Sequence, residues 1–258
     1  MYLEEGRIIR QTSLGHGQFL MEIHCPKIAR ATEPGQFVQV ACGLDTTTDP
    51  LLRRPISIHS FDREKGSFQL YYLVVGKGTE LLSKKMADQK LSVMGPLGKG
   101  FELQKATQTA VLVGGGMGVA PLLALAEELK NKGKKVISLL GAASSDVLVR
   151  AAAFNQYGDL ITVTEDGSLG RKGLVTEFLP SIIENNKAII YACGPLGMLK
   201  AVVAIAAQLD TPCQVSLEAK MACGVGACLG CTCVTSPDGG YPKVCKDGPV
   251  FWAEEVRL

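Results

Sequence analysis

The sequence has no dominant charge and few aromatic side chains. Lys and Arg number 27 against 25 Asp and Glu, and aromatic residues make up 6% of the 258 residues. Nucleic-acid-binding proteins use basic surfaces and aromatic stacking platforms, so we expect no nucleic-acid partner. The charge balance also gives no electrostatic attraction to an anionic membrane.

Signal-like and membrane-spanning segments are also lacking. Residues 1–10 carry two acids and no apolar core of signal length, so we expect a cytoplasmic protein. One apolar run, residues 110–126, is interrupted by four glycines and Pro121. A strand, a glycine turn and a helix explain this run better than a membrane span does, and we expect no membrane association.

Cysteine is abundant and unevenly distributed. Five of nine cysteines lie in the last 36 residues, and an odd number in a chain this long does not fit a secreted disulfide scaffold. Cys223, Cys228 and Cys231 have C-x4-C-x2-C spacing, and Cys245 follows fourteen positions later. This is the plant-type [2Fe–2S] spacing, and neighbouring glycines let backbone N–H groups point at the sulfurs. A structural zinc site and inert thiols are the alternatives, and we interpret Cys233 as a spare packed thiol.

The hydrophobic pattern changes along the chain. Short alternating runs in residues 1–100 predict a small antiparallel barrel or sandwich, ending in a glycine-rich break at residues 92–100. Strand-like and helix-like segments then alternate, which predicts a parallel sheet covered on both faces. The expected strands are 18–24, 36–41, 56–60, 67–75, 109–113, 135–140, 160–163, 188–192 and 214–217, and the expected helices are 121–132, 146–154, 174–184 and 196–209.

The tail after Glu218 is rich in Cys and Gly. About 40 residues cannot bury a large core, so this segment needs a cross-link, such as a bound metal, or a surface to pack against. We therefore expect three domains, at residues 1–100, 101–212 and 213–258.

A glycine turn follows the expected strand 109–113 and precedes the expected helix 121–132. Exposed amides at a helix N-terminus, with no side chains in the way, suit a pyrophosphate, and close packing of strand on helix is the alternative. The glycines of this turn are Gly114, Gly115, Gly116 and Gly118.

The expected strand 188–192 ends in Cys193, Gly194 and Pro195. Ligands bind at the carboxyl ends of parallel strands, so Cys193 either faces the nicotinamide or is a buried thiol beside a turn. The expected strand 135–140 ends without an acid for a ribose 2′-hydroxyl or a base for a 2′-phosphate. We favour NADH over NADPH.

A third motif lies in the β-rich half. The segment LLRRPISI places a rigid proline between a guanidinium and a hydroxyl on a strand, and the planar fork of Arg suits a pyrophosphate. The segment GKGT offers a second amide cradle. A solvated pair of arginines is the alternative interpretation of the first segment. The residues concerned are Arg54, Pro55, Ile56, Ser57, Gly78 and Thr79.

Together these motifs resemble the ferredoxin–NADP reductase superfamily. With the cysteine segment, the chain is similar to the electron-transfer subunit family of class 1B dihydroorotate dehydrogenases. The resemblance covers nearly the whole chain, through LLRRPISI, GKGT, MGPLGKGF, LVGGGMGVAPL, YACGPLGMLK, EAKMACGVGACLGCTC and VCKDGPVF. It implies a multi-domain β and α/β fold: an N-terminal antiparallel FAD-binding β-barrel, a central parallel-sheet α/β nucleotide-binding domain and a small C-terminal [2Fe–2S] domain.

The resemblance also assigns residues to cofactors. Ile56 departs from the superfamily, which often stacks a Tyr on the flavin there, and Leu73 stands where some relatives have Arg. The implied FAD residues are Arg54, Pro55, Ile56, Ser57, Tyr71, Tyr72, Leu73, Gly78 and Thr79. The implied NAD residues are Gly114, Gly115, Gly116, Gly118, Cys193, Gly194 and Pro195. The implied cluster ligands are Cys223, Cys228, Cys231 and Cys245.

The function that the resemblance implies is an electron relay in pyrimidine biosynthesis. Electrons from the FMN of a separate dihydroorotate dehydrogenase catalytic subunit would pass through the [2Fe–2S] cluster and FAD to NAD⁺, in a heterotetramer of two of each subunit. No acid–base residue for dihydroorotate is needed in this chain, because the cofactors carry the chemistry. The cysteine-rich tail is expected to form the subunit interface. The alternatives are a ferredoxin- or sulfide-linked NAD(P)H oxidoreductase subunit, a zinc-binding or redox-sensing interaction protein, and a stand-alone NADH–acceptor reductase.

Overall fold

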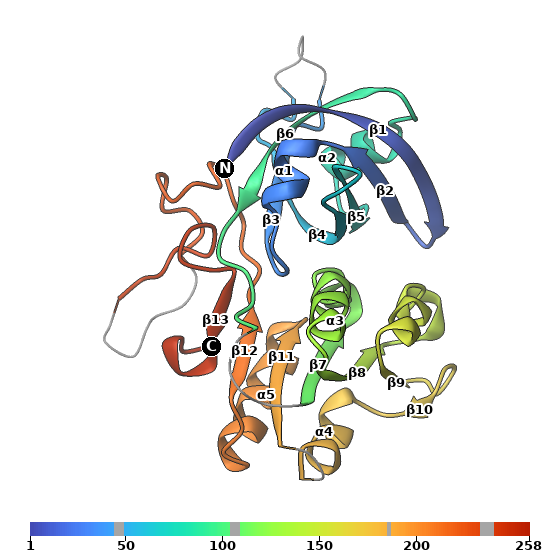
Figure 1. Ribbon diagram of the computed structural model, residues 1–258, viewed down its shortest axis with the longest axis vertical. Coiled ribbons are helices and arrows are strands. Elements are labelled where there is room, and N and C mark those ends of the chain that lie inside the picture. The colour runs from blue at the N-terminus through green and yellow to red at the C-terminus, as the bar shows by residue number, and fades with distance from the viewer. Residues whose placement is uncertain (44–48, 104–108, 185–186, 233–239) are drawn as a thin grey trace. The chain divides into compact units, whose positions relative to one another are not determined.

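The first hundred residues close into a six-stranded antiparallel barrel in the order β1-β2-β5-β4-β3-β6 (Figure 1). The computed structural model describes residues 1–43, 49–103, 109–184, 187–232 and 240–258. Alternate side chains, among them Val38, Ile58 and Leu70, fill the barrel core, so the predicted barrel is confirmed. Its elements are β1 (Tyr2–Gly15), β2 (Gln18–His24), α1 (Pro26–Ala31), β3 (Phe37–Val40), β4 (Arg54–Asp62), β5 (Ser67–Leu73), α2 (Lys77–Ser83) and β6 (Lys90–Leu97).

The glycine-rich break predicted at residues 92–100 is wrong for most of its length. β6 continues to Leu97 and pairs with both β1 and β3. Gly95 lies inside this strand, where a Cβ would come within 2.7 Å of Val38 Cγ1. The glycine therefore permits close packing against β3, and it does not end the strand.

The second half of the chain forms a seven-stranded sheet in the order β10-β9-β8-β7-β11-β12-β13. All neighbours are parallel except β12 and β13, and every residue of β7 and β11 is buried, as expected when both faces of a sheet are covered. The strands are β7 (Thr109–Gly115), β8 (Lys135–Ala142), β9 (Asp159–Thr164), β10 (Arg171–Lys172), β11 (Ala188–Cys193), β12 (Cys213–Ser216) and β13 (Val250–Trp252).

Helices cover this sheet. α4 and α5 contact each other, α4 packs on β7 and β8, and α5 packs on β11 and β12, while α3 packs on β7, β8 and η3. Because β7 has β8 on one side and β11 on the other, the strand order reverses at β7. The helices are η1 (Gly116–Val119), α3 (Leu122–Asn131), η2 (Ser145–Val147), η3 (Ala151–Gln156), α4 (Val175–Glu184), α5 (Leu196–Gln208) and η4 (Ala253–Glu255).

One predicted helix, at residues 146–154, is replaced by the two short 3₁₀ helices η2 and η3. Leu148, Ala151 and Phe154 are buried at a spacing of three residues. That spacing matches the three residues per turn of a 3₁₀ helix. The apolar residues are therefore buried on one face, but the prediction of an α-helix is wrong.

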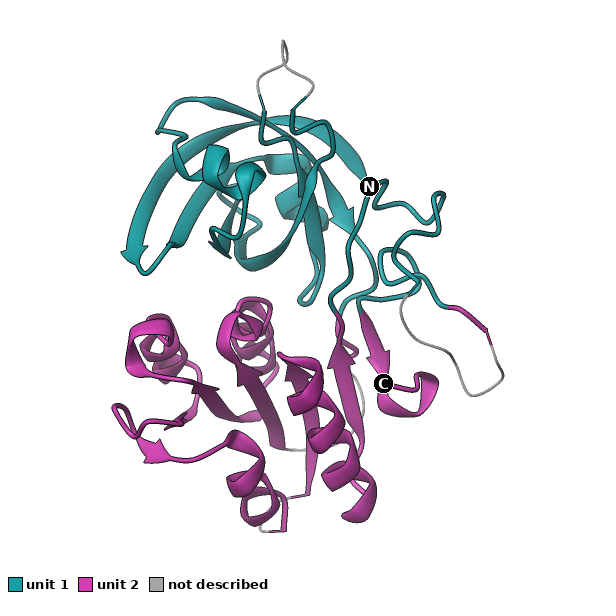
Figure 2. Ribbon diagram, turned by 180° about the vertical axis from the view of Figure 1, so that it is seen from behind, with its two compact units in different colours: residues 1–100, 218–233, 242–249 teal, residues 101–217, 234–241, 250–258 magenta. Residues whose placement is uncertain are grey.

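Contacts divide the chain into two compact units (Figure 2): residues 1–100, 218–233 and 242–249, and residues 101–217, 234–241 and 250–258. The cysteine-rich segment therefore groups with the barrel, and β13 adds the last strand to the α/β sheet. The division into three domains stays a prediction. Within the described residues, no helix has the length and apolarity that a membrane span requires.

Candidate functional site

In the barrel unit, the fold brings the two predicted phosphate-binding motifs together. Arg54 opens β4, and a Cβ on Gly78 in α2 would lie 2.6 Å from Arg54 Nε. The guanidinium thus packs on the backbone of the second motif, and its Nη1 donates to the Leu52 carbonyl at 2.6 Å. A glycine that leaves room for a guanidinium beside the first turn of α2 fits a pyrophosphate site.

The neighbouring Arg53 has a structural role. Its Nη1 donates to the Ser92 carbonyl at 2.9 Å and its Nη2 to Ser92 Oγ at 2.8 Å. Burial lowers the pKa of this guanidinium, but Arg remains charged. Arg53 therefore fixes the start of β4 to β6, while Arg54 lies beside the GKGT segment.

The other residues assigned to FAD lie in different environments. Pro55 and Ser57 are partly exposed on β4, whereas Ile56 and Tyr72 belong to the barrel core. Tyr72 donates to Gln11 Oε1 at 2.9 Å. The buried residues can meet a flavin through their backbone, and their assignment stays a prediction.

Three more of the FAD assignments lie on β5 or α2. Tyr71 is buried and donates to Gln18 Oε1, while Leu73 is partly exposed. The Thr79 hydroxyl accepts from the Val75 N–H at 2.9 Å and donates to the Gly76 carbonyl at 3.0 Å. These bonds order the start of α2, so Thr79 shapes the predicted cradle.

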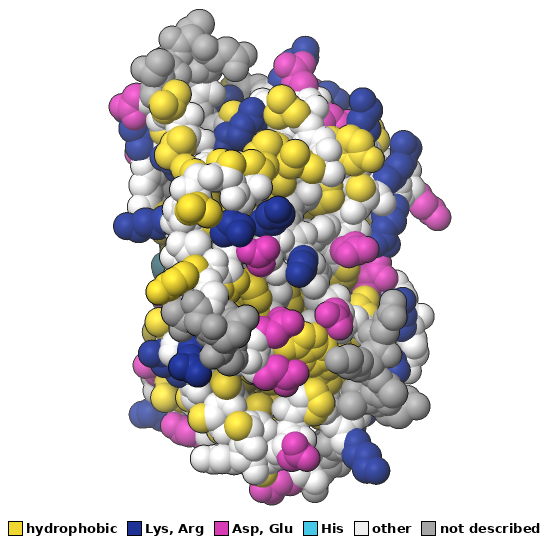
Figure 3. All heavy atoms as spheres, turned by 90° about the vertical axis from the view of Figure 1, so that its left-hand side faces the viewer, with side chains coloured by type: hydrophobic (Ala, Val, Ile, Leu, Met, Phe, Trp, Pro, Cys, Tyr) yellow, Lys and Arg dark blue, Asp and Glu magenta, His cyan; other side chains and the backbone are white. Residues whose placement is uncertain are grey.

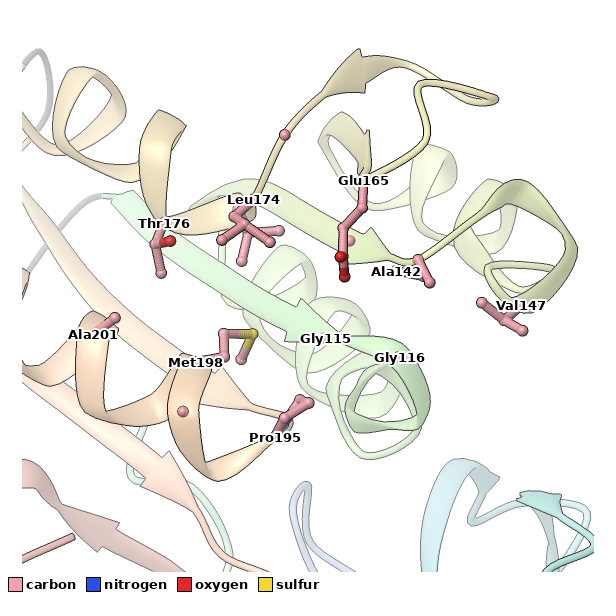
Figure 4. Close-up of a pocket in the computed structure, with 15 residues that line it drawn as sticks. Gly115, Gly116, Ala142, Val147, Glu165, Leu174, Thr176, Pro195, Met198 and Ala201 are labelled. Carbon is pink, nitrogen blue, oxygen red and sulfur yellow. The ribbon is translucent and has the colours of Figure 1, made fainter.

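The α/β unit holds a cavity of about 490 Å³ at the carboxyl ends of its parallel strands (Figure 4). The predicted residues Gly115, Gly116 and Pro195 line it, together with Met198 from α5. Its position beside the reversal of strand order at β7 is where open α/β sheets bind ligands. The cavity is thus the candidate nucleotide site.

The remaining predicted glycines pack between elements. A Cβ on Gly118 would lie 2.2 Å from the Cys193 carbonyl oxygen, and one on Gly114 would lie 2.9 Å from Leu140 Cδ2. Cys193 is buried and paired with Gly114 across β7 and β11, and a Cβ on Gly194 would lie 2.6 Å from Met198 Cε. The glycine turn and the Cys-Gly-Pro segment are therefore brought together. The structure also inserts η1 between the turn and α3.

Sequence reasoning missed one charged residue of the cavity. Glu165 follows β9, its N–H donates to the Ala142 carbonyl at 3.1 Å, and its side chain reaches the cavity (Figure 4). Among the described residues that line the cavity it is the only charged one. The acid that binds a ribose is expected at the end of β8, whereas Glu165 stands just after the end of the next strand, β9.

The four predicted cluster cysteines form two pairs. Cys231 Sγ and Cys245 Sγ are 3.2 Å apart, and the Cys228 thiol contacts the Cys223 sulfur. A two-iron cluster takes two protein ligands on each iron, so this pairing supports the assignment. In the described part of the chain, no three or more His, Cys, Asp or Glu side chains gather as one group that could hold a metal ion, so the structure describes two thiol pairs and not a closed four-thiol site.

Backbone N–H groups point at three of these sulfurs. Val225 N and Cys228 N each lie 3.4 Å from Cys223 Sγ, and Gly226 N lies 3.1 Å from Cys245 Sγ. Cys245 N also donates to Cys231 Sγ at 3.5 Å. The bond from Val225, followed by that from Cys228, lowers the pKa of Cys223 to about 6.

The second pair is in a different electrostatic environment. Burial, followed by the contact with Cys231, raises the pKa of Cys245 to about 12. The first pair has one half-buried and one exposed thiol, and both thiols of the second pair are buried. Two thiol pairs with backbone N–H donors to their sulfurs have the chemistry of an iron–sulfur site. The ligand set itself stays a prediction.

The other cysteines are distinct from this group. Cys25, Cys42 and Cys213 are buried, and burial raises the pKa of Cys42 to about 11 and of Cys213 to about 12. They are packed thiols without thiolate character at neutral pH. Cys233 lies outside the described residues.

Comparison with known proteins gives two family matches. The iron-sulfur cluster binding domain of dihydroorotate dehydrogenase B matches residues 218–257, and the oxidoreductase NAD-binding domain matches residues 112–204. The first match contains all four predicted cluster ligands. The second contains the glycine turn and the Cys-Gly-Pro segment.

Curated relatives and solved structures extend the similarity over the whole chain. The electron transfer subunit of dihydroorotate dehydrogenase B (NAD(+)) from Desulforamulus reducens is 41% identical, and the alignment covers 98% of this chain and 97% of the relative. The corresponding subunit from Fusobacterium nucleatum is 36% identical, and the alignment covers 100% of both chains. A structure of NADH-dependent reduced ferredoxin-NADP oxidoreductase superposes with a TM-score of 0.87 at 33% identity, covering 100% of this chain and 90% of that one.

A more distant structure shares the fold. A ferredoxin NADP⁺ reductase from Neisseria gonorrhoeae superposes with a TM-score of 0.67 at 18% identity, covering 81% of this chain and 92% of that one. The barrel, the parallel sheet and the near-full-length relatives agree with one another. This chain belongs to the family of electron transfer subunits of dihydroorotate dehydrogenase B (NAD⁺).

Proposed function

We propose that this chain is the electron-relay subunit of an NAD-dependent dihydroorotate dehydrogenase. It carries electrons from the FMN of a catalytic subunit, by way of a [2Fe–2S] cluster and FAD, to NAD⁺ in pyrimidine biosynthesis. One observation carries the proposal: four thiols form two pairs, and backbone N–H groups donate to their sulfurs. These thiols lie in the segment that matches the cluster-binding family. A bound flavin can exchange a hydride with nicotinamide and pass electrons singly to such a cluster.

The residues of this chain bind and orient these groups. Arg54 and Gly78 hold the FAD pyrophosphate, and the four cysteines hold the cluster. The cavity beside Gly115 and Pro195, which Glu165 also lines, holds the nicotinamide nucleotide. Glu165 disfavours a coenzyme with a 2′-phosphate, because like charges repel, which supports a preference for NADH over NADPH.

The partner is the FMN-containing catalytic subunit, in a cytoplasmic heterotetramer of two of each chain. We place the interface on the cysteine-rich segment, where Val225 and Leu229 are 38% and 59% exposed. On the face shown in Figure 3, basic and acidic side chains are interspersed among hydrophobic ones. A mixed surface of this kind suits a protein partner better than a polyanion.

The cluster is tested by removing one ligand. In Cys228→Ser we expect the iron and sulfide content of the anaerobically purified chain to fall to background while bound flavin is retained, because a hydroxyl replaces a thiolate ligand. Cys213→Ala is the matched control, since Cys213 is a buried thiol on β12, and it should keep iron, sulfide and flavin. Wild-type protein that contains zinc without iron contradicts the proposal.

A second candidate function is a ferredoxin-linked NAD(P)H oxidoreductase subunit. It is favoured by the 33% identity to the NADH-dependent reduced ferredoxin-NADP oxidoreductase structure over the whole chain. The two functions differ in the electron donor. Reduction of NAD⁺ by the chain together with dihydroorotate and a catalytic subunit supports the first, and reduction that requires ferredoxin supports the second.

A further inference from the structure

Gln39 is a buried side chain whose amide group has no hydrogen-bond partner among the described residues. It lies on β3 with 0% exposure, and in the part of the chain that the structure describes neither its Oε1 nor its Nε2 forms a hydrogen bond. A buried amide gives up its hydrogen bonds to water, and without partners it recovers none of that free energy. Native proteins satisfy nearly all such groups, so this exception requires a physical reason.

A second buried glutamine shows the usual arrangement. Gln214 on β12 is 1% exposed, but its Oε1 accepts from Glu102 N at 2.9 Å and its Nε2 donates to the Glu102 carbonyl at 3.0 Å. Its amide joins two segments of the α/β unit. Gln39 has no such role within the described residues.

The strand period directs Gln39 away from the barrel core. Val38 and Val40 belong to that core, and successive side chains of a strand point to opposite faces. The register partners of Gln39 are Pro55 on β4 and Met94 on β6. Gln39 therefore lies on the outer face of β3, beside the strand that carries the flavin motif.

On that outer face, Gln39 contacts the cysteine-rich segment. A Cβ on Gly224 would lie 2.8 Å from Gln39 Cγ and 3.0 Å from Gln39 Nε2. Gly224 also has a φ of +71°, so both its conformation and this contact require a glycine. The free amide thus lies directly against the residue that follows Cys223.

We infer that Gln39 is a positioning residue for the [2Fe–2S] cluster, and that its Nε2–H group donates to sulfur on the Cys223 side of that cluster. The inference rests on the proposed function. Val225 N and Cys228 N already point at the Cys223 sulfur, and Gln39 adds a donor from the barrel. Donors to sulfur stabilise the more negative, reduced state, so they raise the midpoint potential.

The test is a redox titration of Gln39→Met in the full chain, followed by EPR of the reduced cluster and by flavin absorbance. We expect a more negative cluster potential and altered g values, with the flavin potential unchanged. Gln39→Glu keeps the shape of the side chain and replaces its donor with an acceptor, so the cluster potential should fall further. The iron-free Gln39→Met protein should unfold at the same or a higher temperature, because the unsatisfied amide is gone.

Gln214→Met is the matched control. It should lower the unfolding temperature, because Glu102 loses both bonds, and leave the cluster signal unchanged. Wild-type cluster potential and g values in both Gln39 variants would overturn the inference, as would a shift confined to the flavin. Wild-type protein that lacks iron and sulfide refutes the proposed function itself. An intact cluster whose potential and g values do not change in the Gln39 variants refutes this inference alone.

Discussion

At the scale of single residues, we expect the coenzyme preference to depend on the Glu165 carboxylate. NADPH differs from NADH by a 2′-phosphate, and the cavity offers this anion one acidic side chain and no basic one among its described lining residues. In Glu165→Gln we expect the ratio of the two dissociation constants to shift by about tenfold towards NADPH, which is about 1.4 kcal/mol. Fluorescence titration with each coenzyme measures it.

A neighbouring acid provides the control for Glu165. The Asp166 carboxylate accepts from Ser168 N at 2.9 Å and from Ser168 Oγ at 2.6 Å. Asp166→Asn removes the same charge as Glu165→Gln, but Asp166 does not line the cavity. The ratio of its dissociation constants for NADH and NADPH should therefore match that of the wild type. Equal shifts in both variants would show that net charge, and not the Glu165 position, controls the preference.

A second residue-scale prediction concerns flavin affinity. In Gly78→Ala the new Cβ would lie 2.6 Å from Arg54 Nε, so the guanidinium must move away from the predicted pyrophosphate site. We expect FAD affinity to fall by at least about tenfold, as for the loss of one charge-assisted hydrogen bond. Gly76→Ala is the control, because its Cβ meets no atom within 4 Å. Unchanged FAD affinity in Gly78→Ala would place the pyrophosphate elsewhere.

At the scale of elements, the contact of the glycine turn with the end of β11 shapes the cavity. In Gly118→Ala the Cβ would lie 2.2 Å from the Cys193 carbonyl oxygen, which forces η1 and β11 apart. We expect a loss of about 1–3 kcal/mol in the free energy of unfolding and weaker NADH binding. Urea unfolding and NADH titration measure the two effects.

A glycine that lines the cavity gives the comparison. Gly197 lies in the first turn of α5, and a Cβ there meets no atom within 4 Å. Since alanine is the better helix former, Gly197→Ala should be neutral or stabilising by up to about 1 kcal/mol. Equal destabilisation by the two substitutions would contradict the role given to the Gly118 contact.

The elements that sequence analysis predicts well have strong local patterns. The strand 18–24 matches β2, whose pattern is partly alternating. The strands 109–113 and 188–192 fall within β7 and β11, because continuous apolar runs between turn signals specify buried strands. β1 was not predicted. Most of its residues are exposed or half-buried, so its pairing with β2 and β6 determines its structure, and its own hydrophobic pattern does not.

Prediction of the functional-site residues is limited in the same way, to those with a local sequence pattern. The cysteine spacing and the glycine turn are local signals, and both were found from the sequence. Glu165 and Gln39 were missed because their roles depend on partners distant in the chain: the order of β8 and β9 in the sheet, and the contact of β3 with Gly224. A pattern of neighbouring residues does not contain that information.

At the scale of the whole molecule, the two compact units divide the proposed relay between them. The thiol pairs and the Arg54–Gly78 motif belong to the barrel unit, and the cavity with Glu165 belongs to the α/β unit. Each unit thus carries part of the machinery, and neither is sufficient for transfer from dihydroorotate dehydrogenase to NAD⁺. In the proposed relay, one chain couples a nicotinamide site, a flavin and a cluster.

The most direct test of that claim is an anaerobic visible spectrum of the purified chain before and after addition of stoichiometric NADH. We predict flavin and iron–sulfur bands in the untreated protein, and bleaching of both by NADH, because the flavin takes a hydride and passes electrons singly to the cluster. Bands of both cofactors that remain unchanged after NADH would contradict the account.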